Sequence, residues 1–206
     1  MSSSSEQSMG ITAEGELNNQ LWYPPGGVLM WLIVLVEILF FGIALVFVSK
    51  YHAMAKEDFA LQQQALNLNM GIFLTVSLLV SGWQVAEYVH HRLHQQTKKM
   101  QRSFGLALFF GFLFIAAKVY DYSAKISHGN TFGSGDFWDY YWFLTSVHFL
   151  HVLIGLGILL AVYFKDQSEK NKAEMEVAVQ SGALFWHMCD VIWLFIFPIF
   201  YLGITR

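Results

Sequence analysis

Five long apolar runs constrain the fold of this chain more than any other feature. They cover approximately residues 26–49, 67–89, 104–122, 138–164 and 180–204. Each is close to the roughly 20 residues that a helix needs to cross the hydrocarbon core of a bilayer. Little of the chain is left for a soluble domain. The sequence therefore predicts an all-α integral membrane protein, built as a bundle of five transmembrane helices.

The composition supports a membrane protein. The chain is 55% hydrophobic and only 13% charged, whereas soluble domains average about 25% charged residues. The net charge of −3 argues against a nucleic-acid partner. Cys189 is the only cysteine, so an intramolecular disulfide is excluded and a cysteine-based metal cluster is disfavoured.

Residues 1–25 differ from the rest of the chain. This stretch is polar and acidic and contains no Lys or Arg, so it does not have the basic start of a signal peptide. Pro24 and Pro25 suit the beginning of a helix, where proline is tolerated. We predict a mobile tail over residues 1–25 and one membrane domain over residues 26–206.

The distribution of basic residues predicts the orientation of the chain in its membrane. With five spans, the connections that follow the second and fourth spans lie on the same side as the N-terminus. They carry seven basic residues against four on the opposite side, namely Arg92, Lys98, Lys99, Arg102, Lys165, Lys170 and Lys172 against Lys50, Lys56, Lys125 and Arg206. The positive-inside rule then predicts a cytoplasmic N-terminus and a periplasmic C-terminus.

Glu37 lies in the middle of the first apolar run. A charged side chain at that depth costs roughly 2.5–3.5 kcal/mol on insertion scales, so it usually has a partner or stays protonated. Packing of the helix does not need a carboxyl group there. Glu37 is therefore the leading candidate for a functional residue.

Other polar side chains also fall within or close to the spans. His90 and His91 close the second span, and three further pairs are each three residues apart: Lys118 and Asp121, His148 and His151, and His187 and Asp190. Residues at this spacing share a helix face and can point at the same neighbour. Lys118 and Asp121 are most simply a local ion pair.

Several interpretations of these groups are compatible with the spacing. They could hydrogen-bond across the bundle and fix its packing, as polar side chains between membrane helices commonly do. His148, His151, His187 and Asp190 could instead bind iron, copper or zinc, as in an independent membrane metalloenzyme. A haem would need axial histidines on facing helices, for which His148 or His151 with His187 would serve. Glycines at 105, 111, 155 and 157 are expected where helices approach closely.

The order of the motifs resembles subunit III of haem–copper cytochrome oxidases, in its short five-helix bacterial form. VEILFFGIALVFVSKYH is similar to the helix that carries a buried Glu in this family, EYVHHRL to its paired histidines, and KVYDY to its Gln-x-x-Glu-Tyr element. FLTSVHFLHVLIG resembles its His-x-x-His-Val-x-x-Gly helix, and FWHMCDVIWLFIFPIFYL resembles its last helix. The likeness covers approximately residues 26–204. Asp121 and Lys118 stand where the family has Glu and Gln.

The resemblance implies an accessory subunit without a cofactor of its own, while haem and copper lie in catalytic subunit I. It implies that the chain packs on that subunit, holds phospholipids in a cleft between helices and supports proton uptake. By position, Glu37 is the buried acid of the surface that supports proton uptake. The polar positions of the bundle and lipid cleft are His90, His91, Asp121, His148, His151, His187 and Asp190. An accessory protein of bacterial nitric oxide reductase, from the same superfamily, is the alternative within this resemblance.

Overall fold

The computed structural model describes residues 25–168 and 172–202, and these form helices without a β-strand. Five of the helices are long and apolar enough to cross a membrane: α2 (Gly27–Met54), α4 (Leu68–Leu93), α5 (Thr97–Ser127), α6 (Asp136–Ser168) and α7 (Lys172–Phe197). The predicted five-helix membrane bundle is confirmed. Residues 1–24 of the predicted tail lie outside the described residues.

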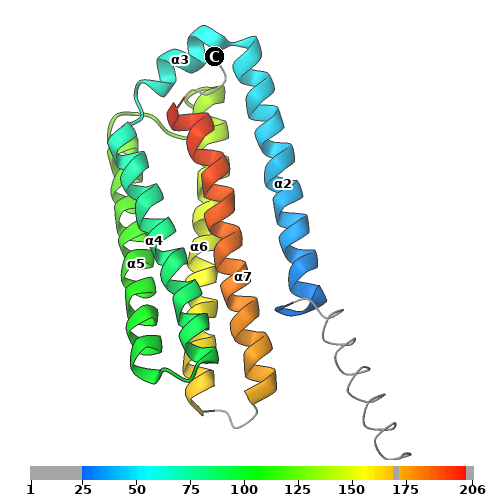
Figure 1. Ribbon diagram of the computed structural model, residues 1–206. Helices are drawn as coiled ribbons and strands as arrows, with labels where there is room; N and C mark the ends of the chain where they lie inside the picture. The colour runs from blue at the N-terminus through cyan, green and yellow to red at the C-terminus, as the bar shows by residue number, and fades with distance from the viewer. Residues whose placement is uncertain (1–24, 169–171, 203–206) are drawn as a thin grey trace, which may run out of the picture.

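The long helices run side by side with alternating direction (Figure 1). The start of α2, the α4–α5 connection, the end of α6 and the start of α7 lie at one end of the bundle. The α2–α4 connection, the α5–α6 loop and the end of α7 lie at the other, which we call the α3 end (Figure 1). This arrangement brings the basic residues at the end of α4 and the start of α5 to the same end of the bundle as the end of α6.

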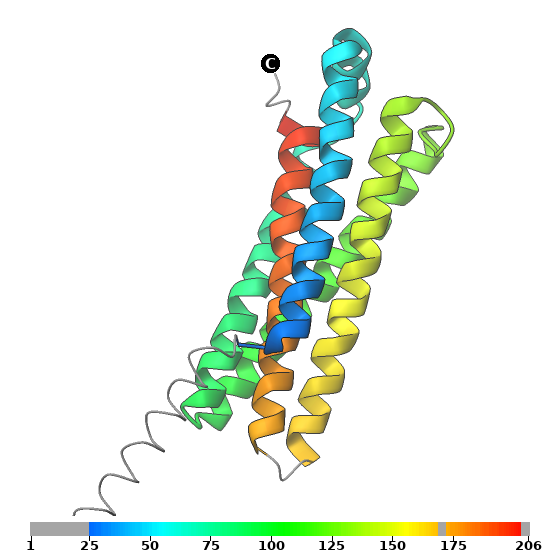
Figure 2. The same cartoon turned by 90° about the vertical axis from the view of Figure 1, so that its right-hand side faces the viewer.

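Helix α7 occupies the centre of the bundle. It packs against α2, α4 and α6, while α4 packs along α5. Figure 2 shows α2 and α6 beside α7 in a second view. In the apolar part of each span, 61% of the residues of α7 are buried, but only 17% of those of α2. Helix α2 therefore contacts the bundle with only a small part of its surface. The rest of its surface is open to lipid or to another protein.

Two glycines of α4 let α7 approach closely. A Cβ atom at Gly71 would lie 2.5 Å from the ring of Tyr201, and one at Gly82 would collide with the carboxylate of Asp190. Of the glycines expected at helix contacts, Gly111 and Gly155 pack on the buried ring of Trp186. Gly105 and Gly157 face open space. Close approach is thus concentrated around side chains of α7 and of η1 (Pro198–Leu202), which follows it.

The α3 end contains two short elements besides the five long helices. Helix α3 (Lys56–Gln63) is anchored by the fully buried Phe59, whose ring lies 4.9 Å from that of Phe137. A five-residue π-helix, η1 (Pro198–Leu202), continues α7. Proline removes a backbone donor, which fits a change of helical hydrogen bonding at Pro198. These elements bring Phe200 and Tyr201 into the bundle core.

Candidate functional site

Glu37 of α2 has a partner on α6. Its Oε2 lies 3.2 Å from Nε2 of His151, and the two side chains are 26% and 15% exposed. Both residues were candidates in the sequence analysis, but a contact between them was not predicted. His151 is held by an edge contact with Phe41 and by stacking near Phe185, from α2 and α7. The carboxyl group thus contacts an imidazole at the junction of three helices.

The second nitrogen of His151 is engaged within α6 itself. Nδ1 lies 2.8 Å from the backbone oxygen of Val147, one turn earlier in α6. A carbonyl oxygen only accepts hydrogen bonds, so Nδ1 must carry a hydrogen. With Nδ1 engaged in this way, Nε2 is the ring nitrogen that faces the carboxyl group of Glu37 at 3.2 Å.

His148 lies three residues before His151 but has different neighbours. It is completely buried, with its ring stacked 5.3 Å from that of Trp193 and edge-on to Phe114. Neither ring nitrogen has a hydrogen-bond partner among the described residues. The shared spacing of His148 and His151 therefore does not give them a shared neighbour.

His187 and Asp190 contact each other across one turn of α7. His187 Nδ1 lies 3.2 Å from Asp190 Oδ2, and the carboxylate is buried against Gly82 while the imidazole is 40% exposed. The other carboxylate oxygen, Oδ1, has no partner in the described part of the chain. The pair thus extends from the exposed side of α7, at His187, to the contact between α7 and α4, at Asp190.

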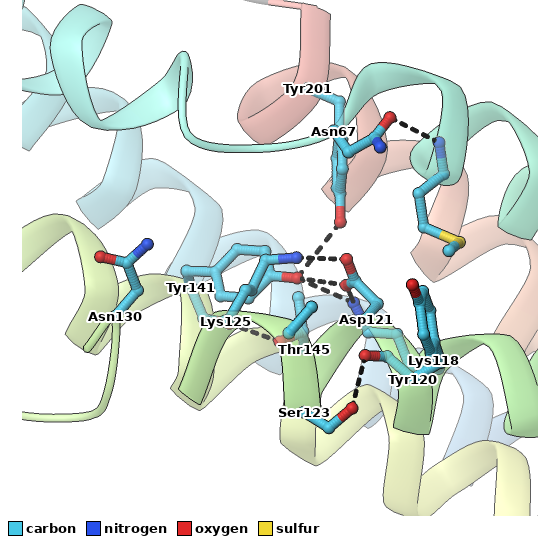
Figure 3. A network of polar contacts seen from close by, with 12 residues as sticks. Asn67, Lys118, Tyr120, Asp121, Ser123, Lys125, Asn130, Tyr141, Thr145 and Tyr201 are labelled. Carbon is cyan, nitrogen blue, oxygen red and sulfur yellow. Dashed lines mark hydrogen bonds and ion pairs between the residues drawn. The ribbon is translucent and has the colours of Figure 1, made fainter. Parts of the chain in front are cut away.

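Asp121 belongs to a larger cluster than the local ion pair expected with Lys118. Its Oδ1 accepts a hydrogen bond from Lys125, and its Oδ2 accepts hydrogen bonds from Lys118 at 3.2 Å and from Tyr141 at 3.0 Å (Figure 3). The Tyr141 oxygen also lies 3.2 Å from that of Tyr201. We call these five residues the Asp121 cluster.

Sequence reasoning missed three members of the Asp121 cluster. The spacing of Lys118, Asp121 and Lys125 was available in the sequence, since all three fall on one helix face. Tyr141 and Tyr201 come from α6 and η1, and no local pattern connects them with α5. The trio on α5 was the signal that could have revealed the cluster.

His90 and His91 lie near the opposite end of the bundle. His91 Nε2 is 3.3 Å from the carboxylate of Glu87, and the exposed His90 ring packs near His94. Close by, Arg92 of α4 forms a bidentate ion pair with Asp166 of α6, with N–O distances of 2.8–3.2 Å. The sequence analysis did not foresee this pair. The Arg92–Asp166 pair ties α4 to α6 at the end that carries most of the basic residues.

The four residues of the metalloenzyme hypothesis do not converge on one point. His151 contacts Glu37, His148 contacts Trp193, and His187 contacts Asp190. Within the described residues, no three His, Cys, Asp or Glu side chains are grouped so that they could hold a metal ion. The polar groups instead form separate contacts within and between helices.

An apolar pocket lies between α2 and the last part of the chain. It measures about 320 Å³ and is lined from α2 by Phe41 and Leu45 and from α7 by Ile192 and Phe195, among others. An apolar pocket of this volume fits part of an acyl chain better than it fits a polar ligand.

Known proteins match the chain along most of its length. The family model for cytochrome c oxidase subunit III matches residues 26–204. A probable quinol oxidase subunit 3 from Staphylococcus haemolyticus is 24% identical over 93% of this chain and 91% of that protein. Cytochrome c oxidase subunit 3 from Bacillus sp. strain PS3 is 26% identical over 64% of each chain. The chain, a multi-pass membrane protein, belongs to the cytochrome c oxidase subunit III family.

Proposed function

We propose that this chain is the accessory, non-redox subunit III of a respiratory haem–copper oxidase. In this role it stabilises the catalytic subunit, binds phospholipid and supports proton uptake by that subunit, in which haem and copper lie. Membership of the family implies association with other oxidase subunits. The contact between Glu37 and His151 is the observation that carries the proton-related part of the proposal.

The geometry of the pair suits a role in handling protons. A carboxyl group and an imidazole, both only partly buried, lie in contact, and α2 is the span with most of its surface open. A partner subunit packed on α2 would bring its own groups near Glu37. Intramembrane ionisable residues commonly mark proton relays, so the pair would accept and return a proton beside the catalytic subunit.

The pocket between α2 and α7 supports the lipid-binding part of the proposal. Its lining is almost entirely apolar, so an acyl chain would bury hydrophobic surface there at little polar cost. The proposed location is the bacterial cytoplasmic membrane, with the N-terminus in the cytoplasm. The asymmetry of Lys and Arg between the two ends supports this orientation.

The test of the proton role replaces Glu37 with Gln in the assembled complex. Both cytochrome c and a quinol should be offered as electron donors, because the relatives bear both names. We expect Glu37→Gln to assemble normally but to lower the rate of proton uptake or to speed inactivation during turnover. Glu87→Gln is the matched control, since Glu87 contacts His91 at the end of α4. Unchanged activity and unchanged inactivation in Glu37→Gln would contradict the proposal.

A purification in mild detergent tests the assignment of the cofactors. The proposal expects haem absorption bands in the complex and none in the isolated chain. Stoichiometric iron or copper in the isolated chain would instead support the metalloenzyme hypothesis.

A further inference from the structure

The Asp121 cluster contains more positive than negative groups. Lys118, Asp121 and Lys125 are 0%, 4% and 5% exposed, and the salt bridges of both lysines go to the same carboxylate. With each group in its usual charge state, the trio carries one excess positive charge. A buried charge without a counter-charge is energetically costly. The cluster therefore requires either a bound anion or one lysine in its neutral form.

The two lysines differ in the hydrogen-bonding capacity left to them. Lys118 donates to Asp121 and Tyr141, and its nitrogen lies 4.7–5.1 Å from three aromatic ring centres, which favour a cation. Lys125 donates to Asp121, and within the described residues the structure gives it no second hydrogen bond. An ammonium group has three N–H donors. Lys125 therefore has donors left for a ligand.

A polar pocket opens directly beside Lys125. It measures about 310 Å³, and its polar lining consists of Asn67, Asp121, Lys125, His128 and Asn130. Asn67 uses its side-chain oxygen to cap α4 at Met70, which leaves its amide N–H groups as donors. Figure 3 shows Asn67 and Asn130 on either side of the cluster. Both oxygens of Asp121 already accept hydrogen bonds, so the pocket offers mainly donors.

The position of the pocket along α5 corresponds to the edge of the membrane. Helix α5 has 31 residues and is about 46 Å long at about 1.5 Å per residue, which exceeds a hydrocarbon core of about 30 Å. Its last turns therefore extend into the headgroup region. Lys125 lies in the last turn, whereas Lys118 lies about two turns deeper.

We propose that this pocket binds the phosphate group of an anionic phospholipid, with Lys125 as the principal ligand and with donors from Asn67 and Asn130. The site is separate from the apolar pocket on α2, and the proposal does not depend on the proton role of Glu37. The phosphate supplies the negative charge that the buried trio lacks. Basic pockets between membrane helices bind lipid headgroups in this way, and charged hydrogen bonds to phosphate are among the strong ones.

The test measures lipid binding by the full-length chain purified in detergent. Native mass spectrometry and thermal unfolding are followed while phosphatidylglycerol, phosphatidylcholine or inorganic phosphate is added. We expect one phosphatidylglycerol to bind and raise the melting temperature, with phosphatidylcholine at least tenfold weaker. Lys125→Gln should weaken phosphatidylglycerol binding about tenfold or more, as expected for the loss of a charged hydrogen bond.

Two further variants keep the result interpretable if Lys125→Gln folds poorly. Asn130→Ala leaves the lysine–carboxylate contacts in place and should weaken phosphatidylglycerol binding several-fold. Lys118→Gln removes the excess charge, so it should weaken binding while leaving the lipid-free chain at least as stable. Lys50→Gln, an exposed lysine at the same α3 end of the bundle, is the matched control and should bind as the unmodified chain does.

Each remaining outcome has a defined meaning. If inorganic phosphate raises the melting temperature as much as the lipid does, the phosphate chemistry is supported and the lipid is the wrong source. Phosphatidylglycerol binding that is unchanged in Lys125→Gln and Asn130→Ala would overturn the site. Binding unchanged in Lys118→Gln would show that Lys118 is neutral and that no charge excess draws the anion.

Discussion

The carboxylate of Asp190 in α7 occupies the space that a side chain at Gly82 in α4 would fill. This contact joins the central helix to α4 and positions Asp190 for its bond to His187. The two helices can approach at this point only because residue 82 has no Cβ atom.

Gly82→Ala should therefore destabilise the bundle. The new methyl group would collide with the Asp190 carboxylate, and overpacking of this kind costs about 1–3 kcal/mol. Thermal unfolding of the purified chain measures the effect. Gly105→Ala is the control, since a Cβ atom there meets nothing within 4 Å. Equal melting temperatures for the two variants would show that Asp190 moves aside without cost.

The Glu37–His151 contact should appear as an energetic coupling between α2 and α6. Polar pairs between membrane helices have coupling energies of about 0.6 kcal/mol on average and up to about 1.7 kcal/mol. We expect His151→Leu to destabilise the chain more in the presence of Glu37 than in a Glu37→Leu background, because the single variant leaves a carboxyl group without its partner. A double-mutant cycle on unfolding free energies measures this, and strictly additive effects would contradict it.

The bidentate pair of Arg92 and Asp166 should tolerate neither truncation nor a change to lysine. Both side chains are largely buried, at 15% and 16% exposed, and charged hydrogen bonds contribute about 1.5–3 kcal/mol. Arg92→Ala should lower the unfolding free energy by about that amount. Arg92→Lys should recover only part of it, because an ammonium group cannot form the two parallel bonds. Arg102→Ala, at an exposed position of α5, should have little effect.

Two tryptophans offer a direct comparison of packing. Trp186 is completely buried between Gly111 and Gly155, whereas Trp83 is 62% exposed. Trp186→Ala should cost about 3–5 kcal/mol through the cavity it leaves. Trp83→Ala should cost much less in the isolated chain. Similar losses for both would indicate that Trp186 does not hold the bundle core together.

The number of membrane helices could be predicted because the length of an apolar run is matched to bilayer thickness. The helix ends could not, since polar residues continue a helix beyond the hydrocarbon. Helix α5 begins at Thr97 and ends at Ser127, well outside the predicted run of 104–122. Helix α3 was missed because it is only eight residues long and mostly polar. Its position depends on Phe59, which is buried only in the folded chain.

Contacts within one helix followed from the sequence more readily than contacts between helices. The spacing of His187 and Asp190 correctly placed them on one face. Spacing could not choose between His148 and His151 as the partner of Glu37. That choice depends on the rotation of α6 against α2, which is set by packing around Phe41 and Phe185. Likewise, Lys118 can form its hydrogen bond to Tyr141 only when α6 lies against α5.

The composition of the Asp121 cluster has a consequence for biogenesis. Its charged residues lie on α5, but the hydroxyl groups that complete their hydrogen bonds come from α6 and from η1, which are synthesised later. Because Tyr141 gives its hydrogen to Asp121, Tyr201 must donate to Tyr141. A chain that stops after α5 would hold two lysines and one aspartate with neither tyrosine. The hydrogen bonds that complete the cluster can therefore form only after α6 and η1 have been made, later than the insertion of the charges on α5.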